Sequence, residues 1–293
     1  MFRLLELEWL KLRGYRPFWV LMILFIVLLF LTNFVTSRGF FLTPHLDPAG
    51  PPIDPRAFIP NYAFPKVWDY VGFWVRMLGG LLPVFIIIST TNELQFRTNR
   101  QNVIDGWSRA EFYHAKWLSC LVIAVAVTLV AGALGAGFGF LTPQDIPAPG
   151  TVDPFTHLLV QQTDLHPEVT GHLDRLFFMF LLVLNYTGFA MTLSFFLKRG
   201  VLTIILFVVF SYFLEKMAAG LVNWQTHTYF GDYFPLQCNA ELLSFPTPDV
   251  IKKAMANPDG HAGPTSTALA LTSAGWLVFY YAVGWWKLRR SDW

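Results

Sequence analysis

Charged residues are scarce in this chain. Asp, Glu, Lys and Arg make up 14% of the 293 residues, whereas a soluble globular domain carries about 25%. Cysteine is scarcer still, and because Cys120 and Cys238 form no CxxC pair, neither a disulfide framework nor a zinc site is indicated. The chain also has no Gly-Lys dipeptide, so it lacks the GxxxxGK[ST] loop that surrounds nucleotide phosphates. With no serine-nucleophile motif either, we expect a chain that is not an enzyme.

Hydrophobic residues, by contrast, make up 54% of the sequence. They gather in six runs, each close to the roughly 20 residues that a bilayer-spanning helix needs. The first run is as long as a full span and has no small-x-small cleavage site, so we expect it to stay as a helix. The sequence therefore predicts an all-α membrane protein with six transmembrane helices, at about residues 18–35, 70–90, 118–141, 176–197, 201–221 and 267–286.

The segments between these runs predict two kinds of connection. Residues 1–16 place Phe2, Leu5 and Trp9 on one helical face, which predicts an interfacial amphipathic helix ahead of the six-span domain, residues 17–293. A frayed cytosolic tail is the alternative. Three long polar connections are predicted as large outer loops, at residues 37–69, 142–173 and 223–266.

Small residues predict how some spans bend and pack. The Gly79-Gly80 pair, with Pro83 shortly after it, predicts a bend in the second span. In the third span, small residues recur every four positions, which allows a neighbouring helix to approach closely; they are Ala131, Gly135 and Gly139. The fourth and fifth spans are joined by residues 198–200 alone, so we expect them to be antiparallel neighbours.

Basic residues predict the orientation of the chain. With six spans, both termini, the segment 92–116 and the hairpin at 198–200 lie on one side and carry 13 Lys and Arg against 6 acids. The other side carries 6 Lys and Arg against 12 acids. Short loops rich in Lys and Arg stay in the cytoplasm. We therefore expect a multi-pass protein of the bacterial cytoplasmic (inner) membrane, with both termini cytoplasmic.

The polar segment 92–116 connects the second and third spans. Its composition favours helix, with a break at Gly106, which predicts two short helices. Trp107 and Phe112 offer an apolar knob beside this break, and charged residues surround it, as expected of a small docking surface; they are Arg100, Asp105, Arg109 and Glu111. A simple solvated turn is the alternative.

This segment resembles the signature of the membrane subunits of type-2 ATP-binding-cassette transporters. In that signature an acid, a Gly-Thr pair, a Pro-x-Ser-Arg group and a lysine follow one another, and the matching residues here are Glu93, Thr98, Ser108, Arg109 and Lys116. Arg97 stands where the usual Gly lies, and Gly106 where the usual Pro lies. The resemblance extends to the amphipathic N-terminal segment, the six-span plan and the basic C-terminal tail.

The resemblance implies a bacterial permease subunit of an ATP-driven transporter, with export as the expected direction. Such a subunit pairs with itself or with a sister permease and recruits a cytoplasmic ATPase, which binds a coupling helix between spans two and three. On this chain the implied ATPase-coupling residues are Glu93, Thr98, Arg100, Gly106, Trp107, Ser108, Arg109 and Lys116. No cofactor is expected on the chain itself, because ATP and Mg belong to the partner ATPase, and no nucleic acid is expected.

Two other functions stay open from the sequence. One is a non-transporting membrane scaffold whose large outer loops bind an extracytoplasmic protein. The other is a secondary transporter, although the sequence has no convincing internal repeat and its intramembrane charges lie near one end of the spans. Both alternatives differ from the first in needing no ATPase partner.

Three ionisable residues fall inside apolar runs, namely Arg76, Glu215 and Lys216. Because an isolated charge in the membrane is costly, we expect Arg76 and Glu215 to pair with each other or to share an outward-facing cavity. Asn185 and Tyr186 in the middle of the fourth span are expected to form hydrogen bonds between helices, and the alternative is that they line a transport path. The histidines of the second outer loop have irregular spacings, so no metal site is expected there; they are His157, His166 and His172.

Overall fold

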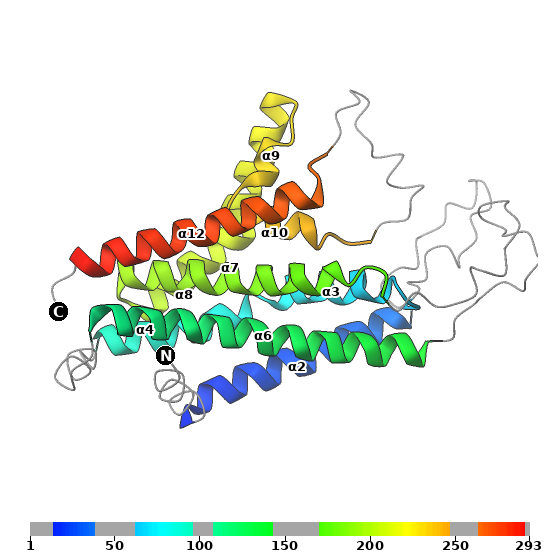
Figure 1. Cartoon of the computed structure of the whole chain (residues 1–293), viewed down its shortest axis with the longest axis horizontal. Helices are drawn as coiled ribbons and strands as arrows, with labels where there is room; N and C mark the ends of the chain where they lie inside the picture. The colour runs from blue at the N-terminus through cyan, green and yellow to red at the C-terminus, as the bar shows by residue number, and fades with distance from the viewer. Residues whose placement is uncertain (1–13, 39–61, 96–107, 143–169, 247–262, 291–293) are drawn as a thin grey trace, which may run out of the picture.

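The computed structural model describes residues 14–38, 62–95, 108–142, 170–246 and 263–290 (Figure 1). Within these ranges the chain is helical and contains no strand. Six helices, some of them interrupted, are long and apolar enough to cross a membrane. The chain is therefore a multi-pass, all-helical membrane protein, as the six apolar runs predict. Most of the predicted interfacial helix, at residues 1–13, lies outside the described residues.

The six spans run back and forth through one bundle (Figure 1). They are α2 (Arg16–Ser37), α3 (Val67–Leu78) with α4 (Leu81–Gln95), α6 (Arg109–Leu141), α7 (Asp174–Leu197), α8 (Gly200–Val209) with η3 (Phe210–Leu214) and α9 (Glu215–Thr226), and α12 (Ser266–Arg290). We name the end where α2 begins and α12 ends the terminal end, and the opposite end the loop end. Helix α4 ends and α6 begins at the terminal end.

Helix α7 forms the centre of the bundle. It packs against α12, α6, α4 and α3, and 67% of its most apolar stretch is buried, against 22% for the stretches in α8–α9 and α12. Residues 198–200 join it to α8, with Lys198 in the left-handed conformation at φ 52°. The predicted antiparallel hairpin is confirmed. Helix α2 packs on α3, α4 and α6 and leaves its other face exposed.

The second span is broken at the glycine pair, as predicted. Helix α3 ends at Leu78 and α4 begins at Leu81. A break in a membrane helix leaves backbone groups that must find other partners. Here the hydroxyl of Tyr212 in η3 donates to the carbonyl oxygen of Met77 at 3.0 Å. A side chain at Gly80 would collide with that tyrosine, so glycine is required for this contact.

Gly135 of α6 faces α3 and Gly139 faces the residues just before α3, which confirms the predicted close approach of a neighbouring helix. A Cβ atom on Gly135 would lie 2.9 Å from the ring of Trp68, and one on Gly139 would lie 2.5 Å from the ring of Phe64. Aromatic side chains therefore fill the space that the glycines leave. Helix α6 itself is longer than the predicted span and begins at Arg109, well inside the segment that the sequence analysis treats as a polar connection.

The fifth span differs most from its prediction. It is interrupted by η3, a π-helical turn, after which α9 leaves the bundle at an angle (Figure 1). The chain then forms η4 (Phe230–Tyr233) and α10 (Gln237–Leu242), which packs against α12 and α7. The region 223–266 was expected to be a loop, but its first part is thus structured. This part folds because of a tertiary contact, in which Gly231 lies directly on the backbone of Ala219 in α9.

Candidate functional site

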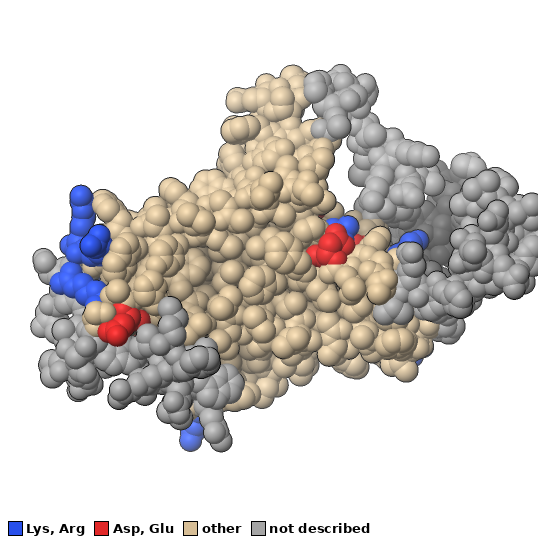
Figure 2. Space-filling model, in the orientation of Figure 1, with Lys and Arg blue, Asp and Glu red and all other residues tan. Residues whose placement is uncertain are grey.

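Charged side chains gather toward the two ends of the bundle, and an uncharged belt separates them (Figure 2). This distribution fits a bundle whose middle lies in lipid. At the terminal end the helix ends and the hairpin supply mostly basic residues, namely Arg16, Arg109, Lys198, Arg199, Lys287, Arg289 and Arg290. The same end holds the described part of the segment 92–116, and we take it as the candidate site.

The site begins with the first turn of α6, which a capping box fixes. The backbone N–H of Glu111 donates to the Ser108 hydroxyl at 3.2 Å, and the backbone N–H of Ser108 donates to the Glu111 carboxylate at 2.7 Å. These two bonds satisfy amide groups that a helix start otherwise leaves unpaired. The Ser-x-x-Glu spacing is a recognised start signal, and applying it would have placed the start of the third span correctly.

Two of the predicted coupling residues form a buried ion pair. Lys116 Nζ lies 2.8 Å from Glu93 Oε1, and the side chains are only 3% and 16% exposed. The Lys116 ammonium also lies 5.7 Å from the ring centre of Phe112. Because Glu93 belongs to α4 and Lys116 to α6, this pair joins the two helices on either side of residues 96–107.

A second set of contacts joins α6 to α12. Arg109 donates from Nη1 to the carbonyl oxygen of Arg289 at 3.1 Å, which places a cation at the C-terminal end of α12, where the helix dipole favours it. One turn further, the Tyr113 hydroxyl donates to the carbonyl oxygen of Tyr281 at 2.6 Å. His114 stacks on Tyr281 with ring centres 6.1 Å apart. Sequence reasoning missed this contact surface, since no local pattern relates residues that are about 170 positions apart.

The remaining predicted coupling residues lie outside the described part of the chain. They are Thr98, Arg100, Gly106 and Trp107. Of the predicted set, the structure thus brings Glu93 and Lys116 into direct contact, uses Ser108 as the cap of α6 and bonds Arg109 to α12. All four lie at the terminal end.

The intramembrane charges do not pair as expected. Among the described residues, no ion pair joins Arg76 to Glu215. Instead Glu215 Oε1 accepts hydrogen bonds from the backbone N–H groups of Leu236 at 2.6 Å and Gln237 at 3.0 Å. Glu215 follows directly after the π-helical turn, and there its carboxylate caps the start of α10. Lys216 lies over the ring of Tyr212, at 5.8 Å from its centre.

At the loop end, a cluster of polar side chains joins three elements. Asp69 of α3 contacts His172 Nδ1 at 2.9 Å and Arg175 Nε at 2.7 Å. Arg175 also donates to the carbonyl oxygen of Leu242, the last residue of α10. The cluster therefore links α3, α7 and α10. Such a link between helices was not predicted from the sequence, in which His172 is considered only as a candidate metal ligand.

A chain of buried polar side chains crosses the bundle interior. Asn185 Nδ2 of α7 donates to the Ser273 hydroxyl of α12 at 2.7 Å, and this hydroxyl donates to Asn239 Oδ1 of α10 at 2.7 Å. All three residues have no exposed surface. The predicted interhelical role of Asn185 is confirmed, and the same bonds hold α10 against the bundle.

The region after α9 provides a low-dielectric environment for its titratable groups. Burial raises the pKa of the Cys238 thiol to about 12, and burial also raises the pKa of Asp232 and of Glu241. A thiol with a raised pKa is unreactive at neutral pH. Within the described ranges, no group of three or more His, Cys, Asp or Glu side chains is placed to hold a metal ion.

A comparison with known protein families gives a match. A family model described as "Protein of unknown function (DUF2705)" matches residues 57–293, which include every span from α3 to α12 but not α2. No curated protein matches the chain.

Proposed function

Because the chain belongs to the family described as protein of unknown function (DUF2705), whose description assigns no activity, we propose its function from its own contacts. The chain is the membrane-spanning permease subunit of an ATP-driven transporter. A separate cytoplasmic ATPase subunit binds the terminal end of the bundle, around residues 92–116, and two permease chains, identical or related, form the transport path. The substrate leaves the cytoplasm.

The observation that carries this proposal is the way in which the helices flanking residues 96–107 are joined. Glu93 near the end of α4 is paired with Lys116 in α6, and Arg109 at the start of α6 is bonded to the end of α12. A displacement applied between α4 and α6 would thus act on three spans together. A connection that merely reverses the chain needs no buried ion pair at its base.

The orientation follows from charge. Most of the described Lys and Arg residues lie at the terminal end, and short cytoplasmic loops are rich in these residues. We therefore place the terminal end in the cytoplasm of a bacterial cell, with the loop end outside. The interfacial helix at residues 1–16 and the coupling helix within 92–116 belong to this proposal.

Purification from the native cell in a mild detergent tests the proposal. The tagged chain should bring down a protein that carries a GxxxxGK[ST] motif, together with ATPase activity. Trp107→Ala and Arg109→Glu should reduce the recovered ATPase at least about tenfold, the effect expected for a hot-spot residue. Arg199→Glu is the matched control, because it reverses an exposed charge at the same end, outside the proposed contact.

The outcomes separate the candidate functions. Recovery of the ATPase by the control and not by the two variants supports docking at residues 92–116. Equal recovery by all three variants would contradict the site, and absence of any nucleotide-binding partner would contradict the function. Absence of a nucleotide-binding partner would favour a scaffold or a secondary transporter, neither of which needs an ATPase.

A further inference from the structure

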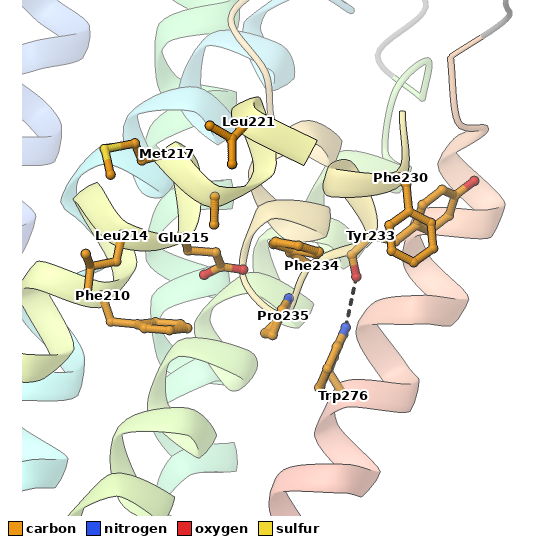
Figure 3. A pocket seen from close by; sticks show the side chains of 11 residues that line it. Phe210, Leu214, Glu215, Met217, Leu221, Phe230, Tyr233, Phe234, Pro235 and Trp276 are labelled. Carbon is orange, nitrogen blue, oxygen red and sulfur yellow. Dashed lines mark hydrogen bonds between the residues drawn. The ribbon is translucent and has the colours of Figure 1, made fainter. Parts of the chain in front are cut away.

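A cavity of about 750 Å³ lies between α9, η4 and α12. Its volume falls within the range typical of small-molecule pockets. Residues from η3, α9, the segment 230–235 and Trp276 of α12 form its walls (Figure 3). Five of these residues are aromatic, namely Phe210, Phe230, Tyr233, Phe234 and Trp276.

Glu215 is the charged residue that lines this cavity. Its side chain is buried, with 4% of the residue exposed. One carboxylate oxygen, Oε1, accepts two backbone N–H groups. The other oxygen, Oε2, is buried and has no hydrogen-bond partner among the described residues. Figure 3 shows the carboxylate turned toward Phe234 and Pro235.

Neighbouring polar groups leave this oxygen without a donor. The indole N–H of Trp276 donates to the carbonyl oxygen of Tyr233 at 3.0 Å, as the dashed line in Figure 3 shows. Arg76 forms no ion pair with Glu215 within the described part of the chain. An acceptor buried without a donor is costly, so the cavity presents a single unmet requirement, for a hydrogen-bond donor, in an otherwise apolar space.

We propose that this cavity binds an amphiphile that carries an ammonium group. The N–H groups of such a ligand would donate to Glu215 Oε2, and its positive charge would match the carboxylate. The aromatic walls attract a cation through their ring faces, and the apolar remainder of the cavity would hold an alkyl chain or ring. A neutral apolar molecule would leave Oε2 without a partner, and an anion would be repelled.

The ammonium group has two possible sources, a lipid with a primary-amine headgroup and a free alkylamine. Both share the chemistry that the cavity recognises. The site is independent of the proposed ATPase contact, because the cavity lies on the α9–η4 side of the bundle and the proposed contact lies at its terminal end. Binding is therefore expected in the purified chain without any partner, and its failure would leave the coupling proposal untouched.

Equilibrium binding of radiolabelled dodecylamine to the full chain in an uncharged maltoside detergent tests the inference. Dodecanol, which has the same chain without the charge, should compete at least about tenfold more weakly, since a charge-assisted hydrogen bond is lost. Glu215→Gln keeps the size of the side chain and should weaken dodecylamine binding by a similar factor. Glu241→Gln is the matched control, because Glu241 is a neighbouring acid that does not line the cavity.

A second variant keeps the test decisive if Glu215→Gln folds poorly. Ala218 is exposed and lines the cavity, so Ala218→Trp should fill the space and abolish binding without disturbing the core. Native mass spectrometry of the chain in an equal mixture of phosphatidylethanolamine and phosphatidylcholine then separates the two sources. Retention of phosphatidylethanolamine that depends on Glu215 indicates a lipid, and dodecylamine binding without such retention indicates a free amine.

Either of those results supports the site. Equal affinity for dodecylamine and dodecanol, or equal binding by the natural chain, Glu215→Gln and Ala218→Trp, would overturn it.

Discussion

The buried ion pair between Glu93 and Lys116 makes the sharpest prediction about stability. The change is Lys116→Met, which keeps the length and apolar stem of the side chain and removes only the ammonium. Lys116 is 3% exposed, and its Nζ lies 2.8 Å from the Glu93 carboxylate. The substitution therefore leaves a buried carboxylate without its cation.

The magnitude follows from charge separation and burial. At an effective dielectric constant of 20, two unit charges at this distance attract each other by about 6 kcal/mol. Removing both charges from water costs several kcal/mol per ion, so the intact pair adds little net stability. Removing one partner is different, because the remaining ion keeps its desolvation cost, and we expect a loss of about 3–5 kcal/mol.

The assay is thermal unfolding of the purified chain in detergent. With an unfolding entropy of about 2.1 cal/mol/K per residue, a chain of this length should lose roughly 5–8 °C in Tm. The double variant Glu93→Gln with Lys116→Met removes both charges and should recover most of this loss. Lys198→Met, at an exposed lysine of the same end, is the control and should change Tm by less than about 1 °C.

Additive losses of stability in the single and double variants would refute this prediction. If the double variant loses as much stability as the two single variants combined, Glu93 and Lys116 do not interact. A small effect of Lys116→Met alone would show that water reaches the carboxylate.

Three further predictions concern packing, pH and topology. Gly135→Ala should lower Tm, because the new Cβ would lie 2.9 Å from the Trp68 ring. Gly137→Ala has nothing within 4 Å of the new Cβ, so it should raise Tm through helix propensity, which is worth up to about 1 kcal/mol. Two Tm shifts of the same sign would contradict the packing. Burial raises the pKa of Glu241 above its ordinary value of 4.5, because the folded chain favours the protonated carboxyl. The contribution of Glu241 to stability is therefore fully present below pH 4.5 and is lost as the pH rises through the raised pKa. Glu241→Gln should therefore flatten the decline of Tm over this range, and an unchanged slope would show that Glu241 is solvated. Both natural cysteines are buried, so they should not react with maleimide. With Arg199→Cys, a membrane-impermeant maleimide should label the chain only after the cell membrane is made permeable. Labelling of intact cells would contradict the proposed orientation.

The spans could be predicted from the sequence because their signal is local. A run of apolar residues near the length of a bilayer is visible without any knowledge of its neighbours, and so is the glycine pair that breaks the second span. The sequence signal for the start of α6 was equally local, because it consists of Ser108 and Glu111. It was missed because hydropathy places the edge of an apolar run, whereas the capping box places the start of the helix.

The contacts of the candidate site could be anticipated only in part. The resemblance selected Glu93 and Lys116, but their direct pairing depends on how α4 and α6 approach each other. The expected partner of Glu215 was a charge at similar depth, and the chain supplied two backbone N–H groups instead. Hydropathy gives no sign that residues after α9 fold back as α10. This return depends on Gly231, which packs on Ala219 and bonds Asn223, and on Asn239, which bonds Ser273 of α12.

The two breaks in the spans meet at one place, and this bears on how a displacement would travel. Tyr212 belongs to the π-helical turn of the fifth span, and its hydroxyl bonds the last turn of α3 beside Gly80. On the terminal side of this point, α4, α6 and α12 are joined by Glu93, Lys116 and Arg109. On the loop side, α3, α7 and α10 are joined through Asp69 and Arg175. The two bonded ends thus lie on either side of the point where the second and fifth spans are broken. Under the proposed function, a displacement of the second span would act on Tyr212 through its bond to Met77, and Tyr212 lies three residues before Glu215, the charged residue in the described wall of the cavity.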